Sequence, residues 1–185
     1  FPLSTHHAPV AFADLGIHPR VIAALKERGI DAPFPIQAAT LPDSLAGRDV
    51  LGRGRTGSGK TVAFAVPMVS ALAKSGRRRA PHTPRALVLV PTRELAIQVA
   101  ETVTPLAAAL ELRTMTIFGG VGQNPQVAAL RRGIDIVIAT PGRLEDLIGQ
   151  GHVRLGEIEV TVLDEADHMA DLGFLPSVKR LLDAT

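Results

Sequence analysis

The sequence predicts an α/β domain in which a parallel sheet is flanked by helices on both faces. Five short runs rich in Val, Ile and Leu show almost no polar alternation, as expected of strands buried on both faces. They lie at 49–52, 86–90, 114–118, 134–139 and 158–163. Helix-like stretches separate them at 61–73, 93–110, 125–131 and 143–148. Strands that alternate with helices are typical of a parallel sheet.

The chain before the first strand predicts a helical cap on this sheet. Two amphipathic segments, 18–28 and 35–45, are joined by a Pro-rich turn, and residues 74–84 have the Gly, Pro and Ser content of a loop. We expect residues 1–11 to be a flexible extension and residues 12–185 to form one domain.

Composition narrows the class of protein. The chain has 185 residues, of which 46% are apolar, and it contains no cysteine, so a disulfide scaffold and a thiolate metal site are excluded. No apolar run reaches the roughly 18 residues of a membrane span, and the first residues lack the order of a secretory signal. We therefore expect a cytoplasmic protein with no membrane partner.

Charge is segregated along the chain although the formal net charge is only +2. Residues 50–93 contain nine Lys or Arg and no acidic residue, whereas residues 155–178 contain six carboxylates and no Lys or Arg. Such opposite segments are expected to meet in the fold.

A phosphate-binding loop is predicted directly after the first strand. Residues 54–61 match G-x-x-x-x-G-K-[ST] between a strand and a helix, a context that argues against a chance Gly-rich turn. The backbone N–H groups of such a loop surround a β-phosphate, Lys60 neutralises phosphate oxygens, and the Thr61 hydroxyl can coordinate Mg²⁺. The predicted nucleotide-binding residues are Gly54, Arg55, Thr56, Gly57, Ser58, Gly59, Lys60 and Thr61.

Two carboxylates follow the last predicted strand. Asp164 and Glu165 would repel each other at a sheet edge unless a cation lay nearby. Together with the phosphate loop they suggest that Asp164 holds Mg²⁺ through water, and that Glu165 polarises the water that attacks the γ-phosphate. The predicted catalytic residues are Lys60, Asp164 and Glu165.

Three further strand ends can receive anions. Two of them start helices that carry an arginine, and the third exposes bare backbone at two glycines. These ends supply Pro91, Thr92, Arg93, Gly119, Gly120, Thr140, Pro141, Gly142 and Arg143. Each alone is as easily an ordinary helix start, but together they favour a ligand with several phosphates in a row, the backbone of a nucleic acid.

Other residue types give weaker signals. Aromatic residues make up only 3% of the chain, so base stacking is scarce and recognition through the backbone is favoured. A solvated loop is the favoured interpretation of the basic run 77–79, and the histidines show no metal-ligand spacing.

Taken in order, these motifs resemble the DEAD-box ATP-dependent RNA helicases, specifically their first RecA-like domain, a P-loop NTPase fold. The resemblance extends over nearly the whole chain. It covers GIDAPFPIQ ending at Gln37, RTGSGKT ending at Thr61, PTRELA at 91–96, Gly-Gly at 119–120, TPGR at 140–143 and DEAD at 164–167. The Arg-rich loop before PTRELA is similar to bacterial members of the RhlE type.

The resemblance implies roles that spacing alone does not supply. Gln37 would contact the adenine edge of ATP, and Phe12 would pack on the base. Asp167 would link the ATP site to the rest of the helicase. PTRELA, Gly-Gly and TPGR would hold RNA phosphates and riboses. The family's Ser-Ala-Thr motif and second RecA-like domain have no counterpart in these 185 residues, so we expect nucleotide binding with feeble hydrolysis.

Two other functions stay open at this point. A DNA helicase or translocase would share the fold, although the segment ending at Gln37 and PTRELA argue against it. A module that clamps RNA and binds ATP without turnover is the other, although Lys60, Thr61, Asp164 and Glu165 are all present. A GTPase is disfavoured because no N-K-x-D element occurs.

Overall fold

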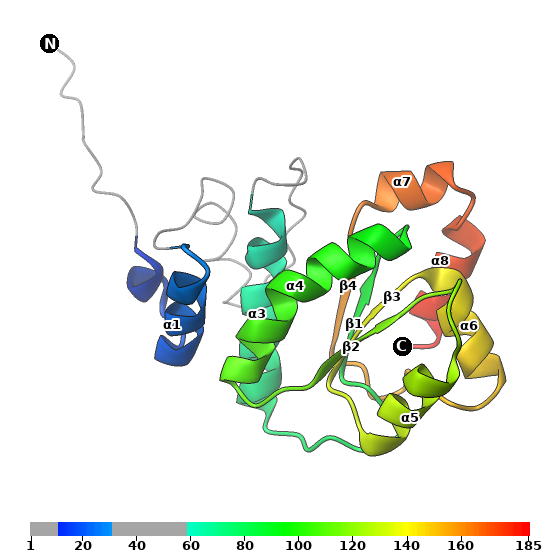
Figure 1. Cartoon of the computed structure of the whole chain (residues 1–185), viewed down its shortest axis with the longest axis horizontal. Coiled ribbons are helices and arrows are strands. Elements are labelled where there is room, and N and C mark those ends of the chain that lie inside the picture. The colour runs from blue at the N-terminus through cyan, green and yellow to red at the C-terminus, as the bar shows by residue number, and fades with distance from the viewer. Residues whose placement is uncertain (1–10, 31–58) are drawn as a thin grey trace, which may run out of the picture.

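Four parallel strands lie between two layers of helices in the computed structural model, which describes residues 11–30 and 59–185 (Figure 1). The strand order is β2-β3-β1-β4. Their bounds are Ala86–Leu89 for β1, Thr114–Ile117 for β2, Ile136–Ala139 for β3 and Val160–Leu163 for β4. The predicted parallel sheet is therefore confirmed.

Helices cover both faces of this sheet. One face carries α3 (Lys60–Ser75) and α4 (Arg93–Ala109). Helix α1 (Pro19–Glu27), which a short 3-10 turn, η1 (Phe12–Leu15), precedes, packs against α4 and not directly on the sheet (Figure 1). The other face packs against α5 (Asn124–Arg132), α6 (Pro141–Gly149), α7 (Ala166–Asp171) and α8 (Leu175–Asp183). The molecule therefore has three layers, as the sequence predicts.

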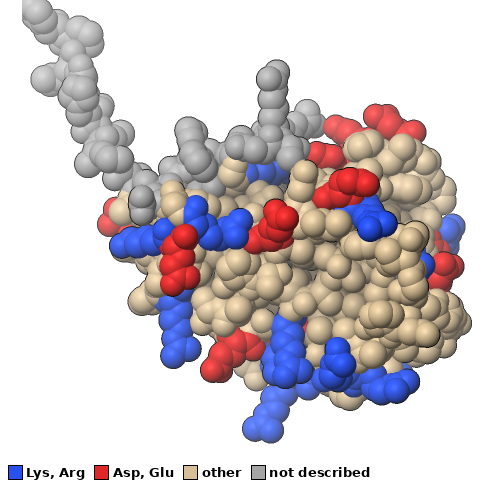
Figure 2. All heavy atoms as spheres, viewed as in Figure 1, with Lys and Arg blue, Asp and Glu red and all other residues tan. Residues whose placement is uncertain are grey.

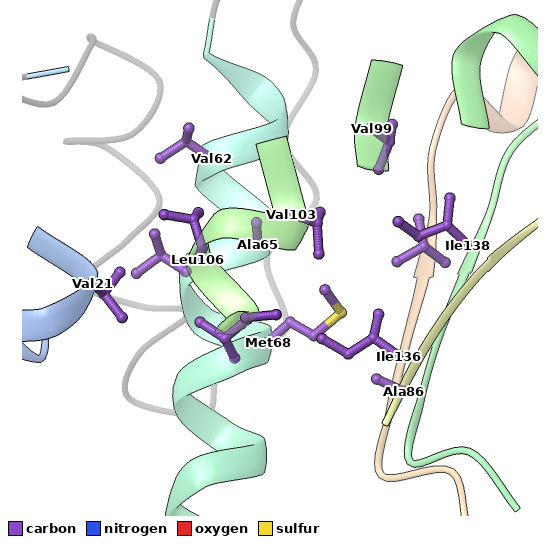
Figure 3. Packing of buried hydrophobic residues seen from close by; sticks show 14 of the residues in the cluster. Val21, Val62, Ala65, Met68, Ala86, Val99, Val103, Leu106, Ile136 and Ile138 are labelled. Atoms are coloured by element: carbon purple, nitrogen blue, oxygen red, sulfur yellow. The ribbon is translucent and has the colours of Figure 1, made fainter. Parts of the chain in front are cut away.

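The central strands are buried on both faces because successive side chains point in opposite directions. In β1, Ala86 and Val88 join the core under α3 and α4, whereas Leu87 and Leu89 join the core under α5, α6 and α8. Figure 3 shows the first of these cores, where Met68 of α3 points toward the sheet. This division explains why the strand sequences lack polar alternation.

Most predicted elements occur within a few residues of their expected bounds. The helices predicted at 18–28, 61–73, 93–110, 125–131 and 143–148 are α1, α3, α4, α5 and α6. Helix α7 was not predicted, because six residues are too few for a helical period to stand out. Helix α8 was not predicted either, although it has nine residues, as many as α5 and α6. The predicted segments 35–45 and 49–52, and nearly all of the extension 1–11, lie outside the described residues.

Within the described ranges, no helix is both long enough and apolar enough to cross a membrane.

Candidate functional site

The carboxyl ends of all four strands lie at one level, which brings the predicted site segments to one edge of the sheet. Leu89 of β1 is in register with the last residues of β3 and β4. The ladder continues one residue further: the Thr140 N–H donates to Ile117 at 2.9 Å, and the Asp164 N–H donates to Leu89 at 3.0 Å. This register is the reason that residues far apart in sequence meet here.

Lys60 and Asp164 form an ion pair at this edge. The distance from Lys60 Nζ to Asp164 Oδ1 is 3.0 Å, and the carboxylate is 6% exposed whereas the lysine side chain is 24% exposed. Gly59, with φ of 79°, lies in the left-handed region and starts α3, so Lys60 is its first residue. The remainder of the predicted phosphate loop, 54–58, lies outside the described residues, as does Gln37.

Glu165 holds a strained backbone next to this ion pair. Its φ of 53° and ψ of 52° are left-handed, a conformation that costs a residue with a side chain about 1–2 kcal/mol. Glu165 Oε2 lies 3.2 Å from His168 Nδ1 on the first turns of α7. Strain of this kind gathers where a fold must aim a side chain. Asp167, in the first turn of α7, is exposed.

The oxygen donors of this edge fit a magnesium ion that is held mainly by phosphates and water. Thr61 follows Lys60 in the first turn of α3, and the buried Asp164 carboxylate forms the ion pair with Lys60. Among the described residues, no group of three or more His, Asp or Glu side chains could enclose a metal ion. Mg²⁺ typically keeps several waters and takes only one or two carboxylates beside a nucleotide.

The strand ends of β1 and β2 meet through an arginine and an aromatic ring. The Thr92 hydroxyl accepts a hydrogen bond from the Leu95 N–H at 3.2 Å and so caps α4. The Arg93 guanidinium lies over the Phe118 ring, 5.2 Å from its centroid, in a cation–π contact. A Cβ at Gly120 would lie 3.7 Å from this guanidinium, and its φ of 80° also favours glycine.

Arg143 joins the strand ends of β2 and β3. Its Nη1 donates to Gln126 Oε1 at 3.3 Å and its Nη2 donates to the Val121 carbonyl at 2.9 Å. Gln126 is 8% exposed and also donates to the Phe118 carbonyl at 3.1 Å. One buried amide therefore holds Arg143 beside the glycine loop.

The other predicted backbone-binding residues occupy the same edge. Thr140 is the N-cap residue of α6, but its side chain makes no cap hydrogen bond. The exposed members of the set are Arg93, Gly119, Gly120 and Gly142, and the partly exposed ones are Thr92, Thr140 and Arg143. Pro91 and Pro141 are buried. The structure brings these segments side by side, as the sequence predicts.

Phe12 lies in the core. Its side chain is 2% exposed and belongs to the cluster of α1, α3 and α4. Its role toward adenine remains a prediction, and packing of the N-terminal segment is the role that its burial supports.

Charge segregation has a broader cause than a nucleotide site. The basic and acidic segments meet at Lys60 and Asp164, but they also meet at the opposite end of neighbouring strands β1 and β4. There Arg85 pairs with Glu159 at 2.9 Å and Arg77 pairs with Glu157 at 3.2 Å. Two of these three pairs therefore lie at the end away from the site.

Two polar contacts, those of Gln126 and of Arg79, could not be expected from the sequence. Gln126 carries no signal except a polar residue at an apolar position of α5. Arg79 is exposed, as expected of the solvated loop 77–79, but its guanidinium also donates to the buried Asp135 carboxylate at 3.0 Å. Asp135 also accepts from Arg85 at 3.3 Å, because parallel strands β1 and β3 begin side by side.

The family model for the DEAD/DEAH box helicase matches residues 34–185, which is most of the chain. This chain belongs to the DEAD/DEAH box helicase family. The predicted RecA-like fold and the resemblance to DEAD-box RNA helicases are thereby confirmed.

Named relatives agree with this family. The ATP-dependent RNA helicase RhlB of Pasteurella multocida is 47% identical over 171 residues, 92% of this chain and 40% of that relative. The ATP-dependent RNA helicase DeaD of Mycobacterium tuberculosis is 47% identical over 175 residues, 94% of this chain and 30% of that relative. The chloroplastic DEAD-box ATP-dependent RNA helicase 3A of Zea mays is 47% identical over 176 residues, 94% of this chain and 23% of that relative.

The chain therefore spans 40% or less of the length of these relatives. The finer resemblance to the RhlE type stays a prediction, since these relatives carry other names.

Proposed function

We propose that this chain is the ATP-binding and RNA-backbone-binding part of an RNA-dependent ATPase that unwinds short RNA duplexes. The observation that carries the proposal is the single sheet edge, where the Lys60–Asp164 pair lies beside three helix or loop starts with Thr92, Gly120 and Arg143. Parallel α/β sheets bind ligands outside the carboxyl ends of their strands.

The ATP half of the edge is β4 and the start of α3. Lys60 pairs with Asp164 at 3.0 Å, so its ammonium group lies at the start of α3, and helix starts commonly bind phosphates. On ATP binding, Lys60 would contact the β- and γ-phosphate oxygens, and Asp164 and Thr61 would hold Mg²⁺. The ion, when bound, neutralises charge that develops between these phosphates.

Hydrolysis of the γ-phosphate is assigned to Glu165. Its left-handed backbone turns the chain sharply between the end of β4 and α7, directly after Asp164. There the carboxylate orients and polarises the water that attacks the γ-phosphate.

The RNA half of the edge is formed by β1, β2 and β3. Arg93 and Arg143 provide guanidinium groups that are already oriented by Phe118 and Gln126, which lowers the entropy lost on binding a phosphate. Gly119 and Gly120 expose backbone that an RNA strand can approach closely. Contacts of this type position a strand without reading its sequence.

Turnover is assigned to a closed form with a second RecA-like domain. The described residues place one lysine at the predicted phosphate site, and transition-state charge in phosphoryl transfer requires further cations. We expect the chain by itself to bind ATP and to hydrolyse it feebly. RNA binding by one strand during closure would separate a short duplex locally.

Two substitutions test the ATP assignment. Lys60→Ala removes the phosphate contact and is expected to weaken ATP binding by the chain at least about tenfold, the loss of roughly 1.4 kcal/mol. Glu165→Gln is expected to retain ATP binding and to abolish hydrolysis by a longer form that carries the second domain. Isothermal calorimetry and phosphate release measure the two effects.

Lys74→Ala is the matched control, because Lys74 is an exposed lysine in the last turn of the same helix. It is expected to leave both measurements unchanged. Equal ATP affinity of the Lys60→Ala and Lys74→Ala variants would contradict the site assignment.

A further inference from the structure

A second group of arginines lies at the end of the sheet opposite the candidate site. Figure 2 shows blue side chains gathered below the region of α5 and of the loop before β1. Five exposed members have no ion-pair partner in the part of the chain that the structure describes. They are Arg78, Arg113, Arg131, Arg132 and Arg154, and we call them the basic end.

Hydrogen bonds join the segments that carry these arginines. The His82 N–H donates to the Leu130 carbonyl at 2.9 Å, and the Arg154 N–H donates to the His82 carbonyl at 2.8 Å. The Arg113 N–H donates to the Asp135 carboxylate at 2.8 Å. Segments from four parts of the chain are therefore fixed around the amino ends of the strands.

The acidic groups at this end are largely neutralised. Asp135 is 1% exposed and is held by two arginines, and Glu157 pairs with Arg77. Glu111 is an exposed carboxylate there, and it uses its backbone carbonyl to accept from Arg79 at 2.9 Å. Because the whole chain carries a net charge of only +2, the basic end is a local concentration and not a reflection of the overall composition.

The chemistry of the basic end suits phosphates better than a protein surface. Stable protein interfaces are centred on apolar or aromatic anchors. Among the described residues, the exposed large apolar side chains are Ile97, Val121, Leu163, Leu172, Leu175 and Leu182, and none belongs to these segments. A polar and strongly positive surface without such an anchor is typical of contacts with a nucleic-acid backbone.

We infer that the basic end is a second surface for the RNA backbone, separate from the strand-end site. Four residues of strand lie between the two surfaces, a distance of at least about 13 Å, so one phosphate cannot contact both. A longer RNA can bind the candidate site with one segment and reach the basic end with the nucleotides that extend beyond that site. The guanidinium groups would hold it through charge, without sequence preference and with strong dependence on salt.

The test is the variant Arg78→Gln, Arg131→Gln and Arg132→Gln. These three side chains are exposed, so the variant is expected to keep the melting temperature of the parent. Its affinity for a long single-stranded RNA is expected to fall roughly tenfold at low salt. The slope of log affinity against log salt is expected to become shallower by about 2, since each lost phosphate contact contributes roughly 0.7.

A matched control removes the same charge elsewhere. Arg20→Gln, Lys26→Gln and Arg28→Gln remove three exposed cations of α1 and the turn after it, and they are expected to leave the salt slope unchanged. Equal loss in both triple variants would reduce the effect to net charge and overturn the inference. No loss in the basic-end variant would also overturn it and leave an acidic protein as the partner class.

RNA length separates this inference from the proposed function. A short RNA that fills only the strand-end site is expected to bind the basic-end variant normally. An Arg143→Gln variant is expected to lose both short and long RNA. If Arg143→Gln binds RNA normally while the basic-end variant does not, the proposed strand-end site fails and the basic end stands.

Discussion

Replacing Arg85 by Met is expected to remove the most connected buried cation of the described residues. Its side chain is 5% exposed and donates to four acceptors, which belong to α3 and to the residues directly before β3 and β4. Nε donates to Glu159 at 2.9 Å and Nη1 to Asp135 at 3.3 Å. Nη2 donates to the Leu72 carbonyl at 2.7 Å and to Ser75 Oγ at 2.6 Å, which anchors the last turn of α3 to the sheet.

The loss of stability in Arg85→Met follows from the carboxylates that keep fewer partners. Asp135 stays 1% exposed with Arg79 and the Arg113 N–H as its remaining donors, while Glu159 loses its guanidinium partner. Breaking a buried ion pair by removing one partner costs about 3–5 kcal/mol. In a domain of this size each kcal/mol corresponds to roughly 2–4 °C, so the melting temperature is expected to fall by about 10 °C.

Thermal unfolding followed by circular dichroism measures this fall, and Arg77→Met is the control. Arg77 makes one ion pair with Glu157, and the two side chains are 57% and 61% exposed. Such a surface pair contributes about 0–1 kcal/mol. If the two variants melt at the same temperature, the buried network does not stabilise the fold as we argue.

Three further predictions concern single residues. Gln126→Leu is expected to weaken RNA binding roughly tenfold, since Arg143 loses a hydrogen bond of about 1.5 kcal/mol, whereas Gln150→Leu should bind normally in the same filter assay because Gln150 bonds only to another exposed amide. Burial raises the pKa of Glu159, but hydrogen bonds from Ser75 and Arg85 outweigh it and hold that pKa below its ordinary value, so its stabilisation is complete above about pH 4.5 and is lost as the pH falls through the lowered pKa. The stability gap between the parent and Glu159→Gln in urea titrations should therefore shrink in acid, and a constant gap would contradict this. Phe12→Ala should lower the free energy of unfolding by about 3–5 kcal/mol without nucleotide, and an unchanged value would point to a role at the base instead.

The sequence predicted the layered architecture because burial on both faces of a strand leaves a direct signal in composition. The run at 86–90 is apolar throughout, the run at 134–139 is apolar except for Asp135, and they correspond to the central strands β1 and β3. Residues that follow strands were also predictable, since the carboxyl ends of parallel strands share one edge. Lys60 and Asp164, more than 100 positions apart, form an ion pair there.

The remainder depends on contacts that no local pattern encodes. Arg78 and Arg79 are neighbours in one basic run, yet Arg79 forms an ion pair with Asp135, as Arg85 does, and Arg78 has no ion-pair partner among the described residues. The contacts with Asp135 depend on the pairing of β1 with β3. The role of Gln126 also has no local sequence signal, because it depends on the Arg143 guanidinium that the fold brings into hydrogen-bond contact with it. Helix α7, with six residues, was too short for periodicity to reveal.

The most direct test of the central claim is ATP hydrolysis with and without nucleic acid. Turnover would be measured for the chain by itself and for a longer form with the second RecA-like domain, each alone, with single-stranded RNA, and with DNA of the same sequence. The account predicts that RNA stimulates the longer form, that DNA does not, and that the chain by itself stays nearly silent. Equal stimulation by DNA would indicate a DNA translocase, and a longer form that binds ATP without turnover would indicate a clamp, so either result would contradict the account.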